Sequence, residues 1–160
     1  MLRKIKNLLA MNNRMKLYLL EALLYLGWAR ILKARQFAKV APTLGIEREE
    51  TSHEHHETTE RTLGYVSRSV RTMAKHTPWE SKCMVMAMAA MKMLERRGIE
   101  STLYLGTAKD HTGKMIAHAW LRSGPYYITG YEEMNKFITV NTFANKLSVR
   151  GEASKMRQTS

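Results

Sequence analysis

Residues 79–130 read WESKCMVMAMAAMKMLERRGIESTLYLGTAKDHTGKMIAHAWLRSGPYYITG, and the fold class follows from this stretch. It contains an uninterrupted apolar run, Cys83 to Met91, within a predicted helix that continues to Arg97 and is closed by Gly98. A glycine directly after a periodic run is a common helix stop, and an apolar run without a polar side belongs to a helix that is covered all round. The sequence therefore predicts a central helix that carries Cys83, the only cysteine, near its start.

Strand-like runs follow this helix. Residues 100–108 and 115–121 are rich in β-forming residues and are joined by the turn KDHTG, and residues 126–129 follow the tight turn Gly124-Pro125. Residues 137–140 (FITV) give a short fourth strand. Helices that come first and hairpin-linked strands that come later indicate an α+β fold, in which the cysteine-bearing helix packs on a small antiparallel sheet.

The N-terminal half is predicted to be helical. Residues 12–40 read as one long helix that Pro42 stops, residues 43–58 as a polar linker, and residues 59–75 as a second helix. The first helix has a broad apolar stripe that is expected to pack against a core or a partner; the stripe consists of Leu17, Leu20, Leu24, Gly27, Ile31 and Leu32. We expect residues 1–58 to form an N-terminal helical extension and linker, residues 59–149 the core, and residues 150–160 a disordered tail.

Composition limits the class of protein. The chain has 160 residues, one cysteine and a formal charge of +12. One cysteine allows no internal disulfide, which fits a cytoplasmic location. The positive charge lies mainly at the two ends and favours acidic partners, but no nucleic-acid motif accompanies it, so no specific nucleic acid is expected and a solvated basic surface is an equal interpretation. The uncharged run between Glu21 and Arg30 is too short to span a bilayer; weak membrane-surface attachment through the basic N-terminus is left open.

The histidine-rich tract HEHH, residues 53–56, superficially resembles a metal site. Its spacing is poor for one helical face, and no further histidine or cysteine lies nearby in sequence. We interpret it as a solvated linker and expect neither a metal nor another cofactor.

Cys83 and His118 are the candidate catalytic pair. A thiol at a helix N-terminus gains stabilisation of its thiolate from unpaired N–H groups and the helix dipole. An imidazole beside it can carry the proton, and the Cys83 N–H can serve as an oxyanion donor. Thr77-Pro78 would start the helix so that Cys83 falls in the second turn, whereas Ser81 as N-cap would put it in the first. The structural alternative is that Cys83 is a buried thiol and His118 a hydrogen-bonded core histidine. The 35-residue spacing of the pair, taken alone, favours this alternative.

Aromatic residues flank this pair in the sequence. On the strand that carries His118, alternation places Ile116 and Trp120 on the same face, where they would wall the imidazole from water. Trp79 precedes the cysteine by four positions. We take Trp79 and Trp120 as walls of the site.

Several phrases in fixed order carry a family resemblance: W-E-S-K-C, an apolar helix closed by R-R-G-I, then L-Y-L-G-T-A-K-D and A-H-A-W-L, with LLEALLYLGWARILKA upstream. Across about residues 17–144 the chain resembles the transglutaminase-like cysteine peptidases of lasso-peptide biosynthesis, which remove the leader from a precursor peptide. The resemblance implies a papain/transglutaminase-like core, with Cys83 as nucleophile and His118 as general base and acid. It also implies a preference for Thr at the penultimate leader position.

The third catalytic residue departs from that family. Its usual aspartate, about a dozen positions after the histidine, is replaced here by Thr129, if the hairpin is one residue shorter, or by Gly130 without a gap. Thr129 could orient the imidazole through its hydroxyl. Otherwise a loop residue must approach, or the pair works as a dyad; the loop candidates are Glu132, Glu133, Asn135 and Asp110.

The resemblance also implies partners. Some relatives carry a leader-binding domain at the N-terminus, and no such β-rich module precedes residue 75 here, so a separate leader-recognition protein is implied. The other implied partners are the lasso precursor itself and a downstream asparagine-synthetase-like lasso cyclase. Two other functions are left open: a non-catalytic basic helical adaptor that binds an acidic peptide, nucleic acid or membrane surface, and transglutaminase-type acyl transfer by the same Cys–His pair.

Overall fold

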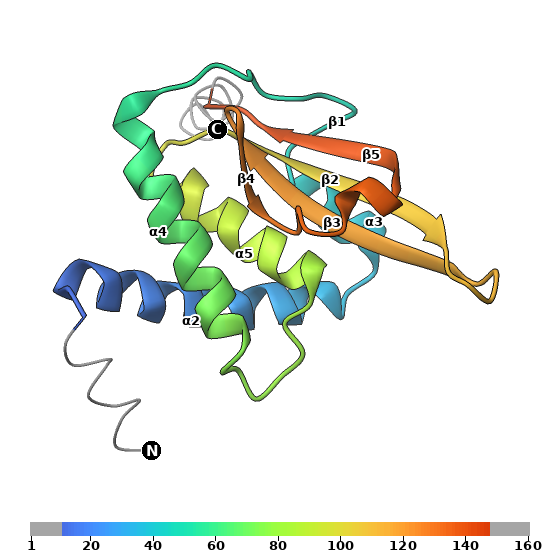
Figure 1. The fold of residues 1–160 in the computed structure, drawn as a ribbon, viewed down its shortest axis with the longest axis horizontal. Helices are drawn as coiled ribbons and strands as arrows, with labels where there is room; N and C mark the ends of the chain where they lie inside the picture. Colours follow the sequence, from blue (N-terminus) through green and yellow to red (C-terminus); the bar gives the residue numbers. More distant parts are fainter. Residues whose placement is uncertain (1–10, 148–160) are drawn as a thin grey trace, which may run out of the picture.

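The computed structural model describes residues 11–147, and its central feature is a five-stranded antiparallel sheet with helix α5 packed against it (Figure 1). The helical elements are α2 (Asn13–Lys33), α3 (Phe37–Val40), η1 (Ala41–Thr43), α4 (Glu57–Ala74), α5 (Cys83–Glu95) and η2 (Met134–Lys136). The strands are β1 (Ile46–Glu47), β2 (Ser101–Lys109), β3 (Met115–Ser123), β4 (Tyr126–Thr129) and β5 (Ile138–Asn145). The predicted α+β class, with its cysteine-bearing helix on an antiparallel sheet, is confirmed.

The sheet has the strand order β1-β5-β2-β3-β4. The long hairpin of β2 and β3 is paired from Thr102↔Arg122 to Lys109↔Met115 without a shift. Strand β4 pairs only with the last three residues of β3, and a register shift marks that ladder between Leu121 and Arg122. The chain then leaves β4, crosses to the other side of β2 and returns as β5 (Figure 1).

Helix α5 is the centre of the core. It packs against β2, β3 and β4 on one side and against α2 and α4 on the others, so that α2 lies beneath it and α4 beside it (Figure 1). Eight of its residues are buried: Val85, Ala87, Met88, Ala89, Ala90, Met91, Met93 and Leu94. Gly98 has the positive φ of 66° expected of a residue that ends a helix. The prediction of a helix covered on all sides is confirmed.

The N-terminal helix differs from the prediction in length and in facing. It ends at Lys33, and one further turn forms at residues 37–40, because the break lets Phe37 pack edge-on against Phe143 and buries Val40. The core face of α2 is made by Met15, Leu19, Ala22, Leu26 and Ala29. The stripe expected from sequence lies mostly outside, with Leu17 68% and Leu24 66% exposed. None of the helices in residues 11–147 is long and apolar enough to cross a bilayer, and the expected tail, residues 150–160, lies outside the described residues.

Helix α5 begins at Cys83, so the cysteine lies in the first turn, as the Ser81 alternative predicted, although the N-cap residue is one position later. Its N-cap residue is Lys82, whose side chain makes no capping hydrogen bond. The two hydroxyls considered as caps bond elsewhere: Thr77 Oγ1 is 2.9 Å from Ser81 Oγ and donates to the Trp79 carbonyl at 3.0 Å. The segment before the helix is therefore a small turn of its own, and Cys83 opens the first helical turn.

A buried arginine fixes the long linker to the sheet. The Arg122 side chain is 1% exposed, and its guanidinium donates to the carbonyls of Thr51, Ser52 and Gly124. Its Nε donates to the Tyr104 hydroxyl at 2.8 Å, and Nη2 donates to Glu50 Oε2 at 3.2 Å. The segment that sequence predicts to be a solvated linker is thus tied to β3 by charge-assisted hydrogen bonds.

The same cluster perturbs two acids. The pKa of Glu50 is lowered, chiefly because the Tyr104 hydroxyl donates to it and because Arg122 is nearby. Burial, together with the bond to Glu50, raises the pKa of Tyr104 to about 12. Since the folded state favours the neutral phenol, the stability contributed by Tyr104 is present below its ordinary pKa of 10.0 and is lost as pH rises through about 12.

Replacement of Arg122 tests this anchor. We expect Arg122→Ala to lower the free energy of unfolding by about 3–5 kcal/mol, because Tyr104, Glu50 and several buried carbonyls lose their donor. Urea denaturation followed by circular dichroism measures the loss. Arg61→Ala, at an exposed position of α4, should change stability by less than about 0.5 kcal/mol. A similar small loss for both variants would contradict the anchoring role.

Candidate active site

Cys83 and His118 line one open cleft of about 690 Å³. Cys83 enters it from the first turn of α5, and His118 enters from β3. The other lining residues are Arg71, Ala74, Lys75, Ser81, Lys82, Met86, Ile116, Ala117, Gly130, Glu132, Glu133 and Phe137. The two residues that sequence singled out, 35 positions apart, therefore face the same cleft, although no hydrogen bond joins the thiol to the imidazole. Catalytic hydrogen bonds are often long in structures without substrate.

The start of helix α5 makes the cysteine environment electropositive. No side chain caps this end, so the first N–H groups of the helix, including that of Cys83, have no helical partner. Lys82 precedes the thiol and forms a 2.5 Å ion pair with Glu80. The pKa of Lys82 is raised, chiefly by its hydrogen bond to Glu80 and its charge, and to a smaller extent by interaction with the charge of Cys83. Both the helix end and the ammonium favour a negative charge at this point.

The His118 ring is held by a main-chain carbonyl. Its Nε2 lies 2.7 Å from the carbonyl oxygen of Gly130. A carbonyl oxygen can only accept, so Nε2 carries the hydrogen, and in the neutral ring Nδ1 is left as the basic nitrogen. The ring also stacks on Phe137 at 4.9 Å and on Trp120 at 5.9 Å between centroids. The imidazole is therefore fixed in plane and in tautomer without a carboxylate.

Two glycines make this arrangement possible. Gly130 has a φ of 76°, and a Cβ there would overlap the carbonyl oxygen of Ala119 and lie 3.0 Å from the Cα of Trp120. Gly106 is the cross-strand partner of His118, and a Cβ there would lie 2.8 Å from the Trp120 ring and 2.9 Å from Phe137. The first glycine brings its carbonyl to the imidazole, and the second leaves room for the rings that stack on it.

An arginine holds the loop that follows Gly130. Arg71 of α4 donates to Glu132 and, at 3.2 Å, to the Tyr131 hydroxyl, and its guanidinium lies 5.1 Å from the centre of the Tyr131 ring. These bonds raise the pKa of Arg71, the Tyr131 hydroxyl being the largest cause and the charge of Glu132 a smaller one. The loop is thereby drawn toward α4, which supports the position of Gly130.

The remaining predicted site residues lie as follows. The Thr129 hydroxyl, expected to orient the imidazole, is buried and has no hydrogen-bond partner among the described residues. The His118 ring bonds instead to the main-chain carbonyl of the next residue, Gly130. Glu132 is engaged by Arg71, Glu133 pairs with Lys136, and Asp110 closes the turn before β3. None of these carboxylates hydrogen-bonds to His118.

The two tryptophans differ in position. Trp120 stacks on the imidazole but, like Trp79, is not among the residues that line the cleft. The indole ring of Trp79 packs against α2 at Gly27. Phe137, Gly106 and Arg71 were not predicted from the sequence. Their roles depend on contacts between segments that are far apart in the chain, and no local sequence pattern indicates such contacts. For Gly130 a signal existed, since a glycine stood where a carboxylate was expected.

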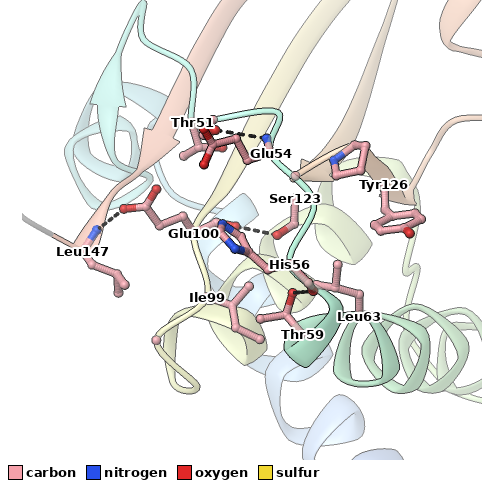
Figure 2. Close-up of a pocket in the computed structure, with 14 residues that line it drawn as sticks. Thr51, Glu54, His56, Thr59, Leu63, Ile99, Glu100, Ser123, Tyr126 and Leu147 are labelled. Carbon is pink, nitrogen blue, oxygen red and sulfur yellow. Dashed lines mark hydrogen bonds between the residues drawn. The ribbon is translucent and has the colours of Figure 1, made fainter.

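A second, smaller cavity of about 190 Å³ lies at the other end of the β2–β3 hairpin (Figure 2). Its polar groups are largely used internally: Ser123 donates to the Glu100 carbonyl at 2.6 Å, and the Leu147 N–H donates to the Glu100 carboxylate at 3.0 Å. Figure 2 shows no cysteine among the residues that line it. Within residues 11–147 no three metal-ligating side chains gather at one point. The chemistry-bearing cleft is therefore the one between α5 and β3.

A comparison with protein families bears on this cleft. The model of the transglutaminase-like superfamily matches residues 22–142. The chain belongs to that superfamily. The match spans α5, β2, β3 and β4, and thus includes Cys83, His118 and Gly130. Members of this superfamily are cysteine peptidases or acyl transferases. No curated protein and no solved structure matches the chain.

The role of Gly130 is testable by nitrogen NMR of His118. We expect the wild-type ring to be in the Nε2–H tautomer at neutral charge, and Gly130→Ala to give a mixture of tautomers, because the added Cβ displaces the carbonyl. Long-range ¹H–¹⁵N correlation spectra measure this.

Two control variants separate the carbonyl from other effects. Thr129→Val removes the neighbouring hydroxyl but keeps the backbone, so the tautomer should not change. Gly113→Ala places a side chain at a φ of 82° with nothing within 4 Å, so it should cost about 1 kcal/mol of stability and leave His118 unaltered. A folded Gly130→Ala protein with an unchanged tautomer would rule out the carbonyl as the orienting group.

Proposed function

We propose that this protein is a cysteine peptidase that removes the leader from a lasso-peptide precursor. The observation that carries the proposal is the shared cleft: it is lined both by a thiol at the uncapped start of α5 and by an imidazole of defined tautomer. The superfamily supplies peptidase or acyl-transfer chemistry. The phrases W-E-S-K-C, L-Y-L-G-T-A-K-D and A-H-A-W-L, which resemble the lasso-leader peptidases, support the narrower assignment.

In the proposed reaction the Cys83 thiolate attacks the carbonyl carbon of the last leader residue. The oxyanion that forms is stabilised by the Cys83 N–H at the helix start. His118 delivers a proton to the leaving amine of the core peptide, the C–N bond breaks, and a thioester joins the leader to Cys83. A water molecule, deprotonated by His118, then attacks the thioester, and the leader leaves with a free carboxylate. Since Nε2 is bonded to Gly130, both proton transfers use Nδ1.

The pair is tested by following leader release by mass spectrometry, with a lasso precursor and a leader-recognition protein present. We expect Cys83→Ala and His118→Ala to slow release at least about a thousandfold, because each removes a member of a unit that acts together. His76→Ala is the matched control, since the His76 ring is exposed at the end of α4 and contacts the Thr72 carbonyl. It should release leader at the wild-type rate.

Other outcomes would assign other functions. Undiminished release by Cys83→Ala would reject the peptidase. A leader product that carries an added amine in place of a free carboxylate would assign acyl transfer. Binding of the precursor without any release by the wild type would favour the non-catalytic adaptor.

The outer face of α2 is the surface we propose for the separate leader-recognition protein, with a lasso cyclase acting downstream. A groove of about 700 Å³ runs between α2 and the end of α5 and is lined by Leu17, Leu20, Glu21, Leu24, Tyr25, Trp28, Arg96 and Arg97. Exposed leucines form its apolar floor, and the last turn of α2 adds the cations Arg30 and Lys33. A second copy would oppose like charges in a chain of +12, so a partner with an apolar ridge and acidic flanks fits best.

This surface is tested by a double substitution. We expect Leu20→Asp with Leu24→Asp to weaken binding of the leader-recognition protein at least tenfold, about 1.4 kcal/mol, and to leave the unfolding free energy nearly unchanged because both side chains are mostly exposed. Surface plasmon resonance measures the affinity. Val140→Asp, at a position 60% exposed on β5, is the control. Equal binding by the double variant and the control would exclude α2 as the docking face.

A further inference from the structure

Strand β3 has an open edge beside the cleft. Strand β2 covers one side of β3 along its length, from Met115 to Arg122. On the other side β4 pairs only with Leu121, Arg122 and Ser123, so residues 115–120 have no strand neighbour there within the described chain. Met115, Ile116 and Ala117 are accordingly exposed. An unpaired strand edge presents a row of free N–H and C=O groups.

The hydrogen-bonding direction along β3 follows from its hairpins. At the β2–β3 turn the Asp110 N–H donates to the Lys114 carbonyl at 2.9 Å, so Lys114 faces β2. Because alternate residues of a strand face opposite neighbours, Ile116 and His118 also point their main-chain groups at β2, while Met115 and Ala117 point theirs to the open side. The two-residue turn Gly124-Pro125 between Ser123 and Tyr126 gives the same alternation, since it requires odd-numbered residues to face β4.

The edge stays open because the chain turns away after β4. Gly130, with its φ of 76°, ends the pairing and covers the carbonyl of Ala119. Arg71 then draws Tyr131 and Glu132 toward α4. The open segment thus begins where β4 stops and runs along Ala117, which lines the same cleft as Cys83 and His118.

We propose that an extended peptide substrate binds by adding a strand to this edge, with its main chain paired to Met115 and Ala117. A strand added there would lie about 4.8 Å from β3, inside the cleft that Cys83 enters. Its alternate side chains would point into the cleft and out to solvent, so alternate substrate positions would determine specificity. This inference rests on the proposed function, because the added strand is the peptide that Cys83 cleaves.

The occupant is a peptide rather than a second copy of the chain. Edge-to-edge pairing of two copies would bring together two proteins of charge +12, and Lys114 directly precedes the open segment. Charged residues, lysine above all, are the usual means by which proteins prevent such pairing. A peptide with few cations meets no such repulsion.

Amide exchange in the full-length Cys83→Ala protein tests the edge directly. The probe is a twelve-residue peptide that spans the cleavage bond of the lasso precursor. On its addition we expect the Ala117 and Met115 amides to exchange at least tenfold more slowly, while Ile116 and His118, already paired with β2, change little. These two residues are the internal controls.

Single N-methylation of the same peptide gives an independent test with wild-type enzyme. Methyl groups on two amides that are two positions apart should each lower kcat/KM at least tenfold, and a methyl on the amide between them should have less than a twofold effect, because that amide points away from β3. Cleavage with no such alternation and no protection of Ala117 would overturn the edge and leave the peptidase in place. Protection of Ala117 without cleavage by the wild type would reject the peptidase and keep the edge. Neither protection nor cleavage would reject both.

Discussion

The structure depends on one constraint: helix α5 is apolar all round and must be covered on every side. Eight of its thirteen residues are buried, and the cover comes from β2, β3 and β4 on one side and from α2 and α4 on the other. Such burial stabilises by about 1.5–3 kcal/mol for each large side chain. The packing on both sides fixes the position of the helix, and it therefore also fixes the position of Cys83, the first residue of the helix. The sheet that covers α5 is also the sheet that carries His118, so folding alone brings the two residues to one cleft.

In this site a main-chain carbonyl orients the catalytic imidazole, a role that an aspartate carboxylate fills in the family that the sequence resembles. A carboxylate beside an imidazole stabilises the protonated ring by direct attraction, whereas a carbonyl offers only a dipole. The Gly130 carbonyl can fix the tautomer and the plane of His118, but it supplies less stabilisation of the imidazolium. The other partner, the thiol, lies at the start of α5, where the first helical N–H groups have no side-chain cap and Lys82 precedes the cysteine. In this chain the thiol therefore lies at an uncapped helix start, and the imidazole is held in position by a main-chain carbonyl.

Much of this fold could be predicted from local patterns, and the exceptions share a cause. The α5 run, its stop at Gly98 and the β2–β3 hairpin follow from periodicity and turn residues, which act within a few positions. The break after Lys33 has no local signal, because it arises from Phe37 packing on Phe143. The sequence left two starts for α5 open, and Lys82 is the N-cap in place of Ser81, whose hydroxyl contacts Thr77. The partner of His118 was sought among side chains, and a main-chain carbonyl carries no residue signature. The interpretation of Cys83 and His118 as a catalytic pair rests on the surrounding phrases, since the 35-residue spacing alone favours a core thiol and a core imidazole.

The two surfaces left open by the fold lie at opposite ends of α5. Cys83 and the open edge of β3 are at its N-terminus, and Arg96 and Arg97, which border the α2 groove, follow its C-terminus. A helix of thirteen residues is about 20 Å long. An extended chain covers about 3.3 Å per residue. If the proposed recognition protein holds the leader at the α2 face, at least about six residues are then needed to reach Cys83. The length of α5 would then set the minimum number of leader residues between the recognition site and the scissile bond. The recognition protein would hold the distal part of the leader, and the edge of β3 would align the residues around the scissile bond.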